Sequence, residues 1–136
     1  MERTIQGDLS WGEAQEDIIK PKIESFFDVG FEKTSKNNEF DYINKDKKII
    51  IELKSRTNKK DKYPTTIIGN NKWCKAQKLL EQGWEIFFFF NFTDVLCYYE
   101  FKNQADIVKS KGGRTDRGRP EIKYYRYIPV SDLVEL

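Results

Sequence analysis

The hexapeptide Ile49-Ile50-Ile51-Glu52-Leu53-Lys54 carries the clearest secondary-structure pattern in the chain. Its three consecutive isoleucines predict a strand buried in the middle of a sheet, because β-branched side chains pack well on a pleated surface. Side chains alternate between the two faces of a strand, so Glu52 and Lys54 should share one face and Leu53 should lie on the other. The pattern therefore predicts a central strand with a carboxylate and an ammonium group close together at its end.

The residues before this strand predict a hairpin that leads into it. Residues 40–43, Phe-Asp-Tyr-Ile, have the pattern of a short strand, and residues 44–47 have the polarity of a turn. Such a hairpin would return Asp41 towards the end of the sheet where Glu52 lies. A further short strand is expected within residues 31–36.

Two helices are predicted, one before and one after these strands. The first should begin at a capping box formed by Ser10 and Glu13 and end at Gly30, because apolar residues recur between them at helical spacing. Pro21 lies inside this pattern and is expected to kink or split the helix. The second helix should span residues 71–82 and carry lysines on one face.

The remaining segments complete an α/β pattern. Two segments rich in basic residues, 55–70 and the Gly/Arg-rich 111–120, are expected to be surface loops. The order of elements predicts a single α/β domain over residues 1–136, with its core at about 10–101 and a central mixed β-sheet flanked by helices. The other predicted elements are strands at 84–92 and 95–101, a short helix at 104–109, a C-terminal strand at 122–128 and a helical turn that begins at Ser131.

Composition excludes several classes of protein. The 136 residues are 38% hydrophobic and 15% aromatic, which fits one folded domain and argues against a disordered chain. No apolar run approaches the roughly 18 residues of a membrane helix, and the first residues lack the pattern of a signal peptide. We therefore expect a cytoplasmic protein without a membrane partner, in which Cys74 and Cys97 are reduced core thiols. The net charge of +2 gives no general argument for a polyanionic partner.

The chain contains no histidine, which excludes Ser-His-Asp and Cys-His catalysis and zinc held by histidine. An enzyme of this composition would use carboxylates, lysines and a hard divalent cation. Asp41 and Glu52, with a backbone carbonyl and water, offer the oxygen ligands that Mg²⁺ prefers, and Lys54 could orient or deprotonate a water molecule. The alternative is that Glu52 and Lys54 form a solvated strand end whose charges pair across the sheet.

Asp41, Glu52 and Lys54, with Leu53 at the variable position, resemble the motif of the PD-(D/E)XK nuclease superfamily. The resemblance extends from about residue 10 to residue 92. It is incomplete at one position, because Phe40 stands where the motif has its nominal proline. It implies a restriction-endonuclease-like core with the element order α-β-β-β-α-β. It also implies divalent-metal-dependent cleavage of phosphodiester bonds.

The resemblance also implies roles for individual residues. Asp41 and Glu52 would be metal ligands, Leu53 would lend its carbonyl, and Lys54 would serve the attacking water. The family often adds a glutamate from the first helix, and residues 12–19 are similar to that helix in phage and archaeal junction-resolving enzymes. Glu16 is the candidate for this third ligand, because capping already accounts for its competitor Glu13. Mg²⁺ is the expected cofactor, with Mn²⁺ as a substitute.

The partner that the resemblance implies is DNA, with RNA not excluded. Junction-resolving relatives act as homodimers on branched or recombination intermediates, and the same is expected here by analogy. Two other hypotheses stay open: a catalytically inactive nuclease-fold module that binds nucleic acid or a protein, and a small α/β protein whose charges solvate its surface. The candidate DNA-binding residues are Arg56, Lys72, Lys75, Arg114, Arg117 and Arg119, with a solvated helix face or a mobile surface loop as the alternatives.

Overall fold

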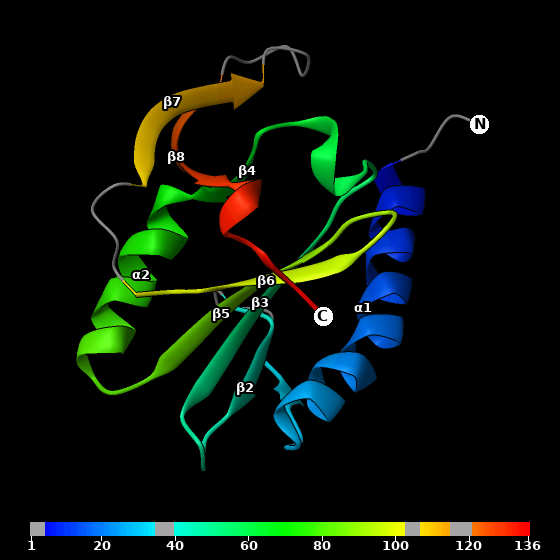
Figure 1. Cartoon of the computed structure of the whole chain (residues 1–136), viewed down its shortest axis with the longest axis vertical. Coiled ribbons are helices and arrows are strands. Elements are labelled where there is room, and N and C mark those ends of the chain that lie inside the picture. The colour runs from blue at the N-terminus through cyan, green and yellow to red at the C-terminus, as the bar shows by residue number, and fades with distance from the viewer. Residues whose placement is uncertain (1–4, 35–39, 103–106, 115–120) are drawn as a thin grey trace.

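The computed structural model describes residues 5–34, 40–102, 107–114 and 121–136, and the side chains of 14–34, 40–102, 107–111 and 124–136. It confirms a mixed α/β fold (Figure 1). The elements in chain order are α1 (Ile5–Phe27), β1 (Glu32–Lys33), β2 (Tyr42–Asn44), β3 (Ile49–Ser55), η1 (Lys60–Lys62), β4 (Thr65–Gly69), α2 (Asn70–Glu81), β5 (Glu85–Asn91), β6 (Leu96–Glu100), β7 (Val108–Arg114), β8 (Glu121–Pro129), η2 (Val130–Asp132) and β9 (Val134–Glu135).

The central sheet has six strands in the order β1-β2-β3-β5-β6-β9. β3 runs parallel to β5, and the other neighbours are antiparallel, which makes the sheet mixed as predicted. The helices α1 and α2 cover opposite faces of it (Figure 1). The register places Glu52 opposite Phe88 and Lys54 opposite Phe90 of β5, so both charged residues lie on a strand that is flanked on both sides.

Alternate residues of β3 and β5 fill two hydrophobic cores. Ile51, Leu53 and Phe89 pack with Ile19 and Ile23 of α1. On the other face, a second core joins these two strands to α2. Its buried members include Ile50, Ile68, Trp73, Ala76, Ile86, Phe88 and Phe90. Because Glu52 and Lys54 alternate with Ile51 and Leu53, they belong to the α2 face of the sheet.

The N-terminal helix differs from the prediction at both ends. α1 begins at Ile5, so the capping box expected at Ser10 is wrong, and it ends at Phe27 rather than at Gly30. Pro21 does not split the helix. Ile19 and Ile23 on either side of it are 3% and 1% exposed, and their burial against the sheet holds the helix across the proline. The end of α2, in contrast, is as expected, with Gly83 at a φ of 88° that suits glycine.

The main correction concerns a second sheet of three antiparallel strands, β4-β8-β7. Residues 55–70 were expected to be a surface loop, yet they hold the end of β3, the turn η1 and all of β4. Thr66 and Ile68 of β4 are buried, which explains why this segment is ordered as a strand. β7 also differs from the prediction. Val108 was expected at the end of a short helix and residues 111–114 at the start of a loop, but both belong to this strand because β7 pairs with β8 along its whole length.

Two smaller expectations concern membranes and thiols. No helix in the described part of the chain has the length and apolar character to cross a membrane. Cys74 and Cys97 are both free, and only Cys97 of the two is fully buried.

Candidate active site

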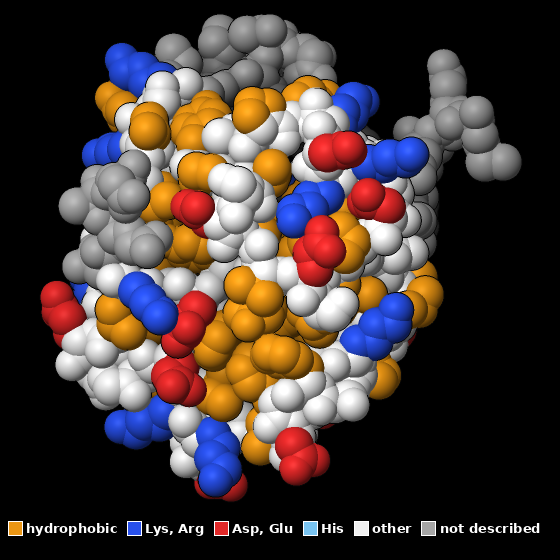
Figure 2. Space-filling view, viewed as in Figure 1, with side chains coloured by type: hydrophobic (Ala, Val, Ile, Leu, Met, Phe, Trp, Pro, Cys, Tyr) orange, Lys and Arg blue, Asp and Glu red, His pale blue; other side chains and the backbone are white. Residues whose placement is uncertain are grey.

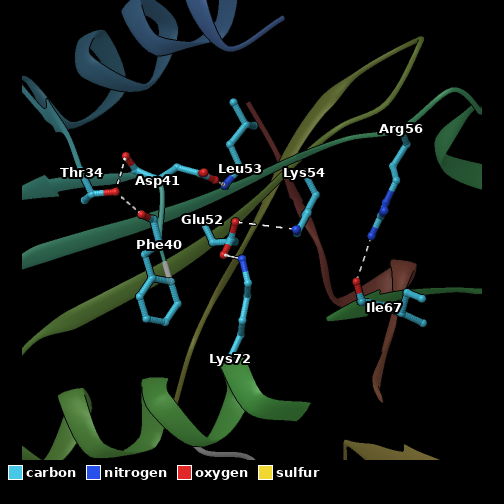
Figure 3. A network of polar contacts seen from close by, with 9 residues as sticks. All are labelled: Thr34, Phe40, Asp41, Glu52, Leu53, Lys54, Arg56, Ile67 and Lys72. Atoms are coloured by element: carbon cyan, nitrogen blue, oxygen red, sulfur yellow. Dashed lines mark hydrogen bonds and ion pairs between the residues drawn. The ribbon is translucent and has the colours of Figure 1, made fainter. Parts of the chain in front are cut away.

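Asp41, directly before β2, is held by hydrogen bonds to β3 and to Thr34. Its backbone N–H donates to the Ile51 carbonyl over 3.0 Å, and its own carbonyl accepts from the Thr34 N–H over 2.9 Å. The Thr34 hydroxyl also donates to the carbonyls of Phe40 and Asp41 (Figure 3). The Asp41 carboxylate accepts from the Leu53 backbone N–H over 2.7 Å. The hairpin therefore fixes this carboxylate against β3, as the sequence predicted.

Glu52 lies beside it and is buried, with 1% of its surface exposed. Its Oε2 accepts a hydrogen bond from the Lys72 ammonium, and its Oε1 lies 3.9 Å from Nζ of Lys54. Lys54 comes from the same strand and Lys72 from the first turn of α2, so the carboxylate sits between two cations (Figure 3). This arrangement excludes the solvated strand end as an explanation for Glu52, because a solvated end would be exposed.

The surroundings of Glu52 favour its protonated form. The pKa of its carboxyl is raised to about 8, first by burial and then by the hydrogen bond and charge of Asp41, while Lys54 and Lys72 act in the opposite direction. A hydrogen bond between two carboxyl groups requires a proton on one of them. Because its pKa is raised to about 8, Glu52 holds this proton near neutral pH.

Lys54 is perturbed in the complementary direction. Burial lowers the pKa of its ammonium, and the charges of Lys72 and Arg56 add to this, while Glu52 and Asp41 oppose it. A lysine with a lowered pKa releases its proton more readily at neutral pH, which is the property that a general base requires.

Glu16, the predicted third metal ligand, does not join the cluster of Asp41, Glu52 and the two lysines. It lies on α1, on the other side of the sheet from Lys72, and forms an ion pair with Lys33 at 3.6 Å. Burial raises the pKa of the Tyr42 hydroxyl. The negative charges of Glu16, of Asp41 and of two other α1 carboxylates raise it further. Among the described residues, no three acidic or cysteine side chains are gathered closely enough to hold a metal ion.

The predicted nucleic-acid contacts are placed in different surroundings. Lys72 contacts Glu52, whereas Lys75 is exposed one turn further along α2. The Arg56 guanidinium donates to the Ile67 carbonyl over 2.9 Å and lies over the Phe90 ring, so it ties the end of β3 to β4. Arg114 lies in β7, where the backbone register places it opposite Glu121 of β8. Arg117 and Arg119 fall outside the described residues.

A cavity of about 560 Å³ opens beside the two lysines. Lys54 and Lys72 line it, together with the start of α2 at residues 69–71 and with Tyr124 and Tyr125 of β8. Sequence reasoning missed these two tyrosines, because the strand was predicted but its neighbours were not. The sequence did hold one signal for Tyr124. It lies two residues before Arg126 in the predicted strand, and this spacing predicts that the two side chains share one face of β8.

A mixed sheet with helices on both faces, and with Asp41 and Glu52-Leu53-Lys54 at its centre, defines the class of PD-(D/E)XK nucleases. Residues 6–136 match the family described as "Phage putative PDDEXK endonuclease", and the chain belongs to this family. Neither a curated protein nor a solved structure matches the chain. The family is one of nucleases, so its substrate is nucleic acid, and PD-(D/E)XK nucleases generally use divalent metals.

Proposed function

We propose that this protein is a metal-dependent endonuclease that hydrolyses phosphodiester bonds in DNA, with Asp41, Glu52 and Lys54 as its catalytic residues. The observation that carries the proposal is the burial of Glu52 beside a second carboxyl group and between two lysines that line a cavity. Burying charge without a partner is costly, and such clusters of perturbed groups gather at functional sites.

The donor set of this cluster fits a hard divalent cation. Asp41 and Glu52 supply carboxylate oxygens, and the Leu53 carbonyl is the third protein ligand that we propose, with water completing the octahedron that Mg²⁺ prefers. Mn²⁺ should substitute for it. The bound cation would lower the pKa of a water molecule and offset charge on the phosphate. Glu16 is left out of this set because it pairs with Lys33.

The chain's own residues would act on the water and on the phosphate. Lys54, whose pKa burial lowers, would accept a proton from the water as its oxygen bonds to phosphorus. One phosphorus–oxygen ester bond then breaks, and the leaving oxygen takes up a proton from solvent. Lys72, at the edge of the same cavity, would contact a non-bridging phosphate oxygen and offset its charge.

One observation favours the second candidate function, a nuclease-fold module that binds nucleic acid without cutting it. The Lys72 ammonium already contacts the Glu52 oxygen that a divalent cation would have to bind. Permanent pairing would block the site. Lys72 projects from a helix on a long flexible stem, however, and 23% of its side chain is exposed, so it is placed to move from Glu52 to a phosphate.

The test is a cleavage assay with supercoiled, linear, single-stranded and four-way-junction DNA, and with RNA, in Mg²⁺, Mn²⁺ or EDTA. We expect metal-dependent cutting of DNA, lost on chelation. Glu52→Gln should abolish it, whereas the matched control Glu100→Gln, on an exposed position of β6, should not. Cutting by Glu52→Gln at the parent's rate would show that the site is assigned wrongly.

The same assay separates the remaining hypotheses. Binding without cutting in every metal would favour the second candidate function. Preferential cutting of the four-way junction would support a role on branched or recombination intermediates, and light scattering would show whether the protein acts as the homodimer that this role implies.

A further inference from the structure

Tyr124 of β8 faces the candidate active site from the second sheet. Its side chain is 47% exposed and belongs to neither hydrophobic core of the described residues. It lines the same cavity as Lys54 and Lys72. The exposed ring thus lies at the wall of a cavity that two lysines also line, where a ligand that enters the cavity can contact it.

Two lysines of β7 surround this ring. The register pairs Lys111 with Tyr124, and Lys109 lies two residues away on the same strand face. Their ammonium groups lie 5.0 Å (Lys109) and 5.9 Å (Lys111) from the ring centroid. Figure 2 shows basic and hydrophobic side chains next to one another over this part of the molecule. An aromatic face beside cations matches both parts of a nucleotide, its base and its phosphate.

Arg126, two residues along β8, fixes the distance between this ring and the site. Its Nε donates to Asn70 over 2.8 Å, and its guanidinium lies 5.3 Å from the centroid of Trp73 in the core. It also donates to the Ile107 carbonyl over 3.3 Å. The strand that carries Tyr124 is thus tied to the first turn of α2, which carries Lys72. A ligand that touches the ring and a ligand that touches Lys72 can therefore be one molecule.

We propose that Tyr124 stacks on an unpaired base of the DNA substrate, next to the phosphate held by Lys72. A base inside a duplex is covered on both faces by its neighbours, so a tyrosine can stack on it only at an end, a branch or a single-stranded segment. The cavity of about 560 Å³ lies within the range of roughly 300–1,000 Å³ that is usual for ligand pockets. This inference rests on the proposed function, because it takes Lys54 and Lys72 to mark the cleaved phosphate.

Tyr63 provides a matched control. It is 53% exposed, and the Lys62 ammonium lies 5.5 Å from its ring centroid, so it shares the exposure and the cationic neighbour of Tyr124. It lines a different cavity, whose lining includes neither Lys54 nor Lys72. A difference between the two tyrosines therefore reports on position and not on aromatic character.

The experiment measures binding of labelled single-stranded and duplex oligonucleotides of one sequence to the metal-free protein by fluorescence anisotropy. Tyr124→Leu should weaken binding of the single strand by roughly 5- to 150-fold, the range for the loss of one stacked base, and should change duplex binding by less than about twofold. Tyr124→Phe, which keeps the ring, and Tyr63→Leu should both bind as the parent does. Oligonucleotides that contain 2-aminopurine should show quenching that Tyr124→Leu removes.

Three outcomes would overturn the inference: unchanged single-strand affinity in Tyr124→Leu, equal losses for single strand and duplex, or equal losses in Tyr63→Leu. Thermal unfolding of each variant shows that it is folded before binding is compared. The proposed function is tested separately, because cutting that depends on Glu52 can persist when the Tyr124 variants bind normally. Stacking by Tyr124 in a protein that never cuts would refute the proposed function alone.

Discussion

The two sheets of this protein contribute opposite kinds of side chain to one cavity. The central sheet lines the cavity with Lys54 and holds Glu52 beside that lysine, 1% exposed and enclosed by compensating charges. The three-stranded sheet supplies Tyr124, which is 47% exposed and surrounded by lysines on its own strands. A buried carboxyl group beside a second carboxyl group suits bond-breaking chemistry, since charge effects are stronger away from water. An exposed aromatic ring suits contact with a substrate. We infer that the first sheet does the chemistry and the second selects the nucleic acid.

The largest effect is expected from removing Lys54, the lysine that the central sheet places beside Glu52. Lys54→Met should lower the single-turnover cleavage rate by roughly 10²- to 10⁴-fold, the usual contribution of a general base, with DNA affinity changed much less. Lys102→Met, on an exposed lysine that pairs with Glu100 at 3.5 Å, is the control and should cut normally. A Lys54→Met variant that loses affinity but not rate would make Lys54 a phosphate contact instead.

A second prediction concerns the pH dependence of metal binding. The pKa of Glu52 is raised to about 8 in the metal-free protein, so below that pH a proton must leave before a cation can bind. Affinity for Mn²⁺, measured by calorimetry, should therefore rise by about tenfold per pH unit between pH 6 and 8 and then level off. Glu52→Gln should bind more weakly and lose this slope. A flat profile in the parent would contradict the carboxyl pair as the metal site.

The third prediction separates Lys72 from its neighbour on the same helix. Lys72 contacts Glu52, so Lys72→Met should strengthen metal binding, on the order of tenfold for one removed unit charge at close range. It should weaken cleavage at the same time, because the phosphate loses a contact. Lys75→Met removes an exposed charge from the next turn and should change neither quantity by more than about twofold. Parallel losses of metal affinity and cleavage would mean that Lys72 only stabilises the site.

The two sheets also differ in how far the sequence predicts them. Three isoleucines and a Glu-X-Lys pattern were sufficient to place Glu52 and Lys54 on one face of a central strand, because side-chain alternation is a local property. β7 could not be found in this way. Its sequence, Val-Lys-Ser-Lys-Gly-Gly-Arg, has too few apolar residues to predict a strand, and its pairing with β8 is what makes it one. The candidate catalytic residues were thus predictable, but the opposite wall of the cavity was not.

Contacts between helices and the sheet were the other limit. Lys72 was predicted as a phosphate contact because α2 has a basic face, yet its contact with Glu52 joins residues 20 positions apart. Glu16 was chosen by resemblance to a helix in related enzymes. The structure pairs it with Lys33, because α1 packs on the face of the sheet that holds Leu53. The rotation of a helix against a sheet depends on tertiary packing, which periodicity alone does not specify.

The smallest effect is expected on stability, from a matched pair of tyrosines. Tyr99 of β6 is 4% exposed and stacks on Phe88, with ring centroids 6.3 Å apart. Tyr99→Leu should therefore lower the free energy of unfolding by about 1–3 kcal/mol, through lost packing and a lost aromatic pair. Tyr124→Leu should change it by less than about 0.5 kcal/mol, because its exposed ring contributes little to the fold. Urea unfolding of both variants measures the difference. A loss of stability in Tyr124→Leu as large as that in Tyr99→Leu would show that this ring supports the second sheet, and its exposure would then say nothing about a substrate.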